Sequence, residues 1–92
     1  MSAKPQTVFP DDKGIIYIEI KELGRLEIHF SKPVLNVSPL PIGSTFDKER
    51  GIFYWQAGPG FIGDYRFVFV EKQENGRWLK RNIKIKVSSN RH

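Results

Sequence analysis

The chain has 92 residues, of which 39% are hydrophobic, and a formal net charge of +5 at pH 7. A chain of about this size buries only about 60–65% of its unfolded surface, so there is room for one core and hardly for a deep catalytic cleft. The chain has no cysteine, which excludes a disulfide framework and a thiolate zinc site.

The two ends of the chain have the polar composition of connecting segments. Residues 1–13 contain two prolines and no apolar periodicity, so they are expected to form a linker. Residues 89–92 are expected to form a C-terminal tail, which leaves one domain at 14–88. The sequence shows neither the apolar core of a signal peptide nor the roughly 18 consecutive apolar residues of a membrane span.

The first half of the domain has an apolar period of two. Apolar and polar residues alternate over 16–20 and over 26–30, which predicts two strands joined through residues 22–25. Each strand is expected to have one core face and one wetter face. Prolines on both sides of Val34–Val37 leave room only for a short strand at a sheet edge.

The second half predicts a long hairpin. Tyr65–Val70 is apolar at nearly every position, as expected of a central strand covered on both faces. Asn75 and Gly76 follow it and predict a type I′ turn, because both residues tolerate a positive φ. The returning strand is expected at Trp78–Val87, with its isoleucines pointing inward.

No helical spacing and no internal repeat accompany these strands. About seven short strands separated by proline and glycine turns predict an all-β protein, an immunoglobulin-like Greek-key β-sandwich.

Three segments carry a more specific pattern: LPIGSTFD at 40–47, GIFYW at 51–55 and GDYRF at 63–67. Their order resembles the bacterial putative-Ig and dystroglycan-type cadherin-like domains, which occur in tandem in surface proteins. The resemblance covers about the last half of the chain. It implies an immunoglobulin-like sandwich from a larger extracellular or cell-surface protein.

The shared residues also have physical roles of their own. Phe53 and Trp55 lie on one face of a strand and can fill the middle of a two-layer core. Tyr65 follows Gly63 at a strand start, where its hydroxyl can reach nearby backbone, as in the tyrosine corner of sandwiches. These residues favour a fold and do not indicate an activity.

Neither catalysis nor a metal site is expected. His29 alternates outward on its strand and His92 is the last residue, so neither predicts a nucleophile arrangement. A calcium site needs roughly six to eight oxygen ligands, whereas the acids here are dispersed. Asp11 and Asp12 are the only candidates for the remnant of a junction site, and no cofactor is expected.

Two sets of residues are candidates for binding a ligand or a partner. Sugar rings stack on exposed aromatic side chains, so a glycan site would use Tyr17, Tyr54 or Trp78. Alternation places Lys80, Lys84 and Lys86 on one face of the last strand, which is expected to lie near a sheet edge. Lysines there protect a sheet against aggregation, and nucleic acid is disfavoured because no recognition motif accompanies the charge.

These patterns together predict a non-catalytic structural or adhesive module, a spacer domain of an exported protein. Its partners would be neighbouring domains of the same polypeptide or another protein. A carbohydrate-binding module attached to an exported enzyme is the alternative.

Overall fold

The computed structural model describes residues 5–11 and 14–89, and within these residues it contains strands and no helix. The strands follow one another along the chain as β1 (Gln6–Val8), β2 (Ile15–Lys21), β3 (Arg25–His29), β4 (Val34–Asn36), β5 (Thr45–Asp47), β6 (Ile52–Gln56), β7 (Gly63–Lys72) and β8 (Trp78–Ser88).

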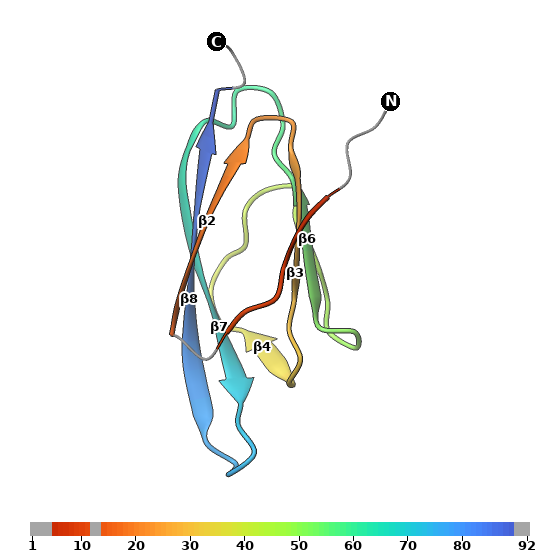
Figure 1. Cartoon of the computed structure of the whole chain (residues 1–92), viewed down its shortest axis with the longest axis vertical. Helices are drawn as coiled ribbons and strands as arrows, with labels where there is room; N and C mark the ends of the chain where they lie inside the picture. The colour runs from red at the N-terminus through yellow and green to blue at the C-terminus, as the bar shows by residue number, and fades with distance from the viewer. Residues whose placement is uncertain (1–4, 12–13, 90–92) are drawn as a thin grey trace.

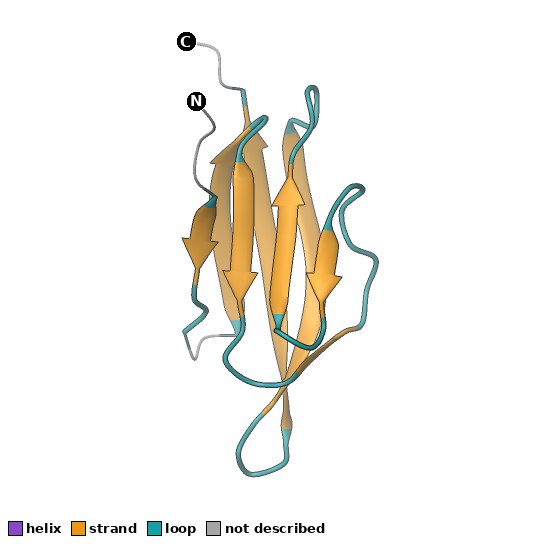
Figure 2. Ribbon diagram, turned by 90° about the vertical axis from the view of Figure 1, so that its right-hand side faces the viewer, coloured by secondary structure: helices purple, strands orange, loops and turns teal. Residues whose placement is uncertain are grey.

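The strands form two four-stranded sheets that face each other (Figures 1 and 2). Sheet A has the order β1-β3-β6-β5 and sheet B the order β2-β8-β7-β4. Both sheets are mixed, because β1 pairs with β3 and β2 pairs with β8 in parallel. The prediction of an all-β, immunoglobulin-like sandwich is confirmed, with eight strands in place of about seven.

The core lies between the sheets and follows the predicted alternation. Ile16, Ile18 and Ile20 of β2 belong to the same buried cluster as Phe53 and Trp55 of β6, which have no exposed surface. The Trp55 indole also donates a hydrogen bond of 3.0 Å to the Ile42 carbonyl. An aromatic group that is buried with its polar atom satisfied stabilises the core without a desolvation penalty.

Tyr65 forms the backbone contact that the sequence suggests. Its hydroxyl donates to the Phe61 carbonyl over 3.1 Å, and its ring packs edge-on against Trp55 with the centroids 4.8 Å apart. The ring is half-buried. This contact fastens the loop before β7 to the core.

Two predictions about individual strands are wrong. Gln6–Val8, expected in the linker, form β1 and pair with Leu26–Ile28 of β3. The strand that carries the lysines, β8, lies between β2 and β7 and is therefore not near a sheet edge. Residues 1–4, 12–13 and 90–92, which belong to the expected linker and tail, lie outside the described residues.

The turn of the β7–β8 hairpin also differs from the prediction. Gly76 has a φ of 84° and its N–H donates to the Gln73 carbonyl over 2.9 Å, but Asn75 has no positive φ. A type I′ turn needs a positive φ at both central residues. The geometry instead fits a four-residue turn that ends on a left-handed glycine, which the Asn-Gly pair also allows.

Candidate interaction surface

Strand pairing builds a row of polar side chains across the outer face of sheet B. Tyr17 of β2 lies opposite Lys84 of β8, and Lys84 lies opposite Arg66 of β7. Their neighbours along each strand, such as Ile18 and Phe67, point into the core. Neighbouring strands are about 4.8 Å apart, so the three side chains form a continuous ridge, which we call the basic ridge.

A groove lies on each side of the basic ridge. One groove has a volume of about 360 Å³ and runs between the ridge and the residues Ile15, Asn82 and Val68. The other has a volume of about 340 Å³ and is bordered by Asp64 and Lys86. The wall of the first groove opposite the ridge is therefore apolar at Ile15 and Val68 and polar at Asn82, whereas both walls of the second groove carry charge.

An aliphatic patch extends from the first groove over β7 and β4. Leu35 pairs with Val70, and the backbone N–H of Val37 donates to the Val68 carbonyl. Leu35 and Val37 are 40% and 56% exposed, while Val68 and Val70 are half-buried. The prediction that both faces of the Tyr65–Val70 strand are covered is thus wrong for the outer face. We call Leu35, Val37, Val68 and Val70 the aliphatic patch.

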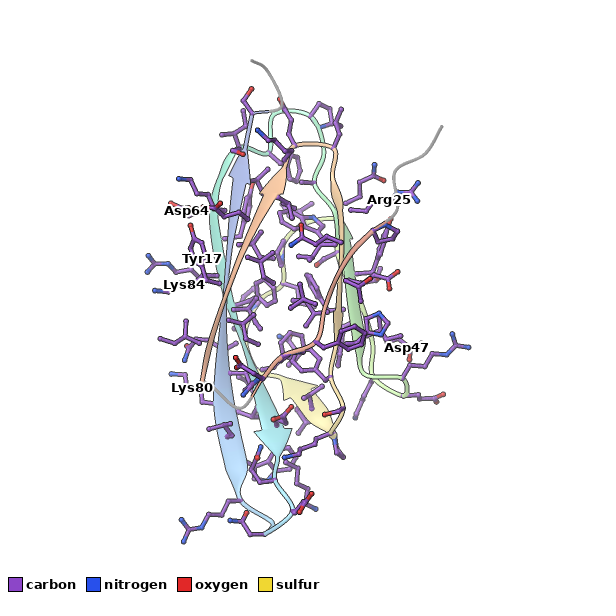
Figure 3. The ribbon with its side chains drawn as sticks, viewed as in Figure 1. Tyr17, Arg25, Asp47, Asp64, Lys80 and Lys84 are labelled. Atoms are coloured by element: carbon purple, nitrogen blue, oxygen red, sulfur yellow. The ribbon has the colours of Figure 1, made fainter. Side chains whose placement is uncertain are left out.

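Positive charge is concentrated on this same face. The acids of β2, β7 and β8 on that face are Glu19 and Asp64, and the cations that alternate outward on these strands far outnumber them. The cations are Lys21, Arg66, Lys72, Lys80, Lys84 and Lys86. Figure 3 shows Lys80, Lys84, Tyr17 and Asp64 pointing away from the core on one side of the molecule. Arg25 and Asp47 lie on the opposite side, on sheet A.

Tyr17 is held in place by an acidic neighbour on its own strand. Its hydroxyl donates a hydrogen bond of 3.2 Å to the Glu19 carboxylate, and its side chain is 59% exposed. The pKa of Tyr17 is raised above its ordinary value by partial desolvation, by this hydrogen bond and by the negative charges of Glu19 and Asp64. The phenol is therefore a neutral hydrogen-bonding group at physiological pH.

The three aromatic residues that the sequence suggests for a glycan site lie in different places on the sandwich. Tyr17 lies on the basic ridge, and Trp78 lies on the same face at the far end of β8. Trp78 is six positions from Lys84, about 20 Å along the strand. Tyr54 pairs with Glu27 and Thr45 on sheet A, so it lies on the other side of the sandwich. The three rings do not form one stacking platform.

The predicted lysines do share the outer face with Tyr17, as alternation indicates. Sequence reasoning missed Arg66, Ile15 and Val68 as members of this surface. The signal was available for two of them, because Arg66 and Val68 alternate with the core residues Phe67 and Phe69.

The residues considered for metal binding or catalysis do not converge. Among residues 5–11 and 14–89, no three acidic or histidine side chains gather as a metal site would require. Asp12 and His92 lie outside the described residues. His29 Nε2 lies 2.7 Å from a Glu27 oxygen on the outer face of sheet A.

Arg81 is a second group that the sequence pattern did not single out. It alternates inward on β8, has no exposed surface, and donates from Nη2 to the backbone carbonyl of Asp11. Its Nε and Nη1 have no hydrogen-bond partner in the described part of the chain. Glu71 of β7 is the other charged residue buried among the described residues, and we assign Arg81 to the closure of the core by its contact with the Asp11 backbone.

Comparison with models of protein families and with curated proteins gives no match to this chain. No helix in the described ranges has the length and hydropathy needed to cross a membrane.

Proposed function

We propose that the chain is a non-catalytic, immunoglobulin-like interaction module whose outer face of sheet B binds an acidic protein surface. The observation that carries this proposal is the aliphatic patch on β7 and β4. Apolar side chains on both faces of a strand are typical of a strand covered on both sides, and here one side is open. The basic ridge beside the patch indicates that the missing cover carries acidic side chains.

A protein partner fits this face better than a glycan does. Protein interfaces combine an apolar centre with a charged rim, and the aliphatic patch beside Arg66 and Lys84 has that composition. A glycan site would be favoured by several coplanar aromatic rings, but Tyr17 and Trp78 are about 20 Å apart and Tyr54 lies on the other sheet.

The course of the chain supports binding over a spacer role. Gln6 pairs with Leu26 near the start of β3, and Gln6 and Ser88 line the same shallow pocket. The first and last strands therefore begin and end at one end of the sandwich (Figure 1). A module attached at one end presents its faces freely, whereas an in-line spacer needs connections at opposite ends.

The resemblance in the second half of the chain supports a place in a larger extracellular or cell-surface protein. Modules of that kind bind through exposed sheet faces or end loops. We therefore extend the proposal to an adhesive role at the cell surface.

Two short peptides test the proposed partner chemistry. One alternates leucine with glutamate and the other alternates leucine with lysine, and the affinity of each for the whole chain is measured by calorimetry. We expect the acidic peptide to bind and the basic one not to bind. The affinity should fall as salt rises, because exposed charge pairs are screened.

Matched charge reversals locate the surface. Lys84→Glu should weaken binding of the acidic peptide by about tenfold or more, which corresponds to about 1.4 kcal/mol. Arg25→Glu makes the same charge change on sheet A and should leave the affinity unchanged. Equal losses in both variants, or binding of a sulfated polysaccharide without binding of the acidic peptide, would contradict the proposal.

A further inference from the structure

The four edges of the two sheets differ in length. The edge strands β1, β4 and β5 have three residues each, whereas β2 has seven. An edge strand presents unpaired backbone N–H and C=O groups, so a longer edge offers more of them. β2 is the long open edge of the sandwich.

The pairing with β8 determines which backbone groups of β2 are unpaired. The Gly14 carbonyl accepts from the Asn82 N–H, and the Glu22 N–H donates to the Ser88 carbonyl. In a parallel pair the bonded residues alternate, so even-numbered residues of β2 face β8. The backbone groups of Ile15, Tyr17 and Glu19 therefore point away from the sheet. The Lys21 N–H does so as well, whereas the Lys21 carbonyl accepts a hydrogen bond from the Gly24 N–H.

The usual devices that block an edge are few in β2. The strand contains no proline, and its register runs without a bulge from Ile15 opposite Asn82 to Lys21 opposite Ser88. Ile15 and Tyr17 are more than half exposed. Proline, bulges and short length are the features that protect edges in other sheets, and β2 relies on two charged residues alone.

We propose that β2 is a strand-addition site that pairs antiparallel with β2 of a second copy of this chain. The two-fold axis passes between Ile18 of one copy and Ile18 of the other. Tyr17 then lies opposite the partner's Glu19, and Ile15 lies opposite the partner's Lys21. The phenol–carboxylate hydrogen bond that Tyr17 makes within its own strand can form equally well across this pair.

Self-complementarity selects this register over its neighbours. Centring the pair on Glu19 places two carboxylates directly opposite each other, which is destabilising. Centring it on Tyr17 leaves Ile20 and Lys21 outside the pairing. Only the register centred on Ile18 pairs the whole of β2 and brings no like charges face to face.

The dimer would join both copies of sheet B into one continuous sheet. A two-fold axis perpendicular to the sheet keeps the two outer faces on the same side, so the two basic ridges would flank the junction. This inference does not depend on the acidic partner, because the pairing uses the outward backbone groups of β2, although the Tyr17 side chain belongs to both surfaces.

A single proline substitution tests the edge directly. The Glu19 N–H points away from β8, so Glu19→Pro removes an outward donor and leaves the β2–β8 hydrogen bonds intact. Glu19→Ala is the matched control, since it removes the same side chain and keeps the N–H. The dissociation constant of the whole chain and of both variants is measured by analytical ultracentrifugation.

We expect the wild type and Glu19→Ala to dimerise and the dissociation constant of Glu19→Pro to be at least about tenfold higher. Thermal unfolding of each variant checks that the monomer is folded. A wild type that stays monomeric up to about 1 mM, a concentration at which even weak pairing is detected, would overturn the proposal. Equal dimerisation of all three proteins would do the same.

A cysteine pair tests the register without a proline. The chain has no cysteine of its own. Directly opposite residues of a hydrogen-bonded pair have their Cα atoms about 5.5 Å apart, within the range of a disulfide. A mixture of Tyr17→Cys and Glu19→Cys proteins should form a crosslinked heterodimer faster than either protein crosslinks with itself. Equal rates in the mixture and in the separate proteins would overturn the register.

Discussion

Trp55 shows how much of the stability rests on single residues. It is fully buried, packs against Tyr65 and donates a hydrogen bond to the Ile42 carbonyl. Trp55→Ala should lower the free energy of unfolding by about 3–5 kcal/mol, because it removes a large buried side chain and leaves a cavity. Chemical denaturation measures this loss. A change of less than about 1 kcal/mol would contradict the core placement.

Leu23 is a residue under local strain. Its φ is 67°, in the turn closed by the Gly24 N–H and the Lys21 carbonyl, and its side chain is half-exposed. A left-handed conformation costs a residue with a β-carbon about 1–2 kcal/mol, and glycine loses about 0.5–1 kcal/mol more entropy on folding. Leu23→Gly should therefore raise the free energy of unfolding by about 0.5–1 kcal/mol.

Leu23→Ala is the control for lost side-chain contacts, because alanine keeps the β-carbon and the strain. The two variants are compared by denaturant unfolding. A glycine variant less stable than the alanine variant would show that strain at this turn is not the deciding term.

Tyr17 should titrate at a higher pH than an ordinary tyrosine. Desolvation, the Glu19 hydrogen bond and the nearby carboxylates all raise its pKa in the folded state. The stability linked to this proton is complete below the unfolded pKa of about 10 and is lost as pH rises through the higher folded pKa. Absorbance of the phenolate, measured in a Tyr54→Phe and Tyr65→Phe background, follows the titration.

Glu19→Gln should move the Tyr17 pKa back toward its ordinary value, since the charge is lost and an acceptor remains. A phenol that titrates near pH 10 in both proteins would contradict the contact between Tyr17 and Glu19.

At the scale of the strands, the alternation of apolar and polar residues predicts which face of the sheet a side chain occupies, but it does not predict which strands are neighbours. The inward isoleucines of β2 and β8 could be read from the sequence because the side-chain period of a strand is two. The neighbours of β8 could not be read from the sequence, since an outward lysine is equally compatible with a central strand and an edge strand. β1 was missed because Gln6 and Thr7 pair through their backbone and carry no apolar pattern.

The lysines of β8 should contribute little to stability. Lys80 and Lys86 are exposed and Lys84 is half-buried, and the ion pairs among the described residues, His29–Glu27 and Arg50–Asp47, involve none of the three. Charge reversal at each position should change the free energy of unfolding by less than about 0.5 kcal/mol. Thermal and denaturant unfolding measure it. A loss of several kcal/mol at Lys84 would show a structural role and would make Lys84→Glu unsuitable as a probe of binding.

At the scale of the whole molecule, the fold was predictable and the binding surface was only partly so. Alternation, turn residues and the residues around Trp55 together indicate a two-layer core. The surface depends on register between strands that are distant in sequence, such as Tyr17 beside Lys84 and Lys84 beside Arg66. Such pairings arise from packing of the complete sandwich and leave no local pattern.

Calcium should have no effect on the stability of the chain. Asp47 and Asp64 lie on opposite sides of the sandwich, and a calcium shell needs about six to eight converging oxygens (Figure 3). The unfolding temperature should therefore be the same in millimolar calcium and in chelator. A rise of several degrees with calcium would contradict this expectation and point first to Asp11 and Asp12.

Under our proposal, the outer face of sheet B is the surface that binds an acidic partner. Amide chemical shifts of the whole chain, followed while the leucine–glutamate peptide is added, test it most directly. We predict that the largest shifts fall on residues of the basic ridge and the aliphatic patch, such as Tyr17, Arg66, Val68 and Lys84. Shifts confined to sheet A around Arg25 and Tyr54, or no shifts at saturating peptide, would contradict the claim.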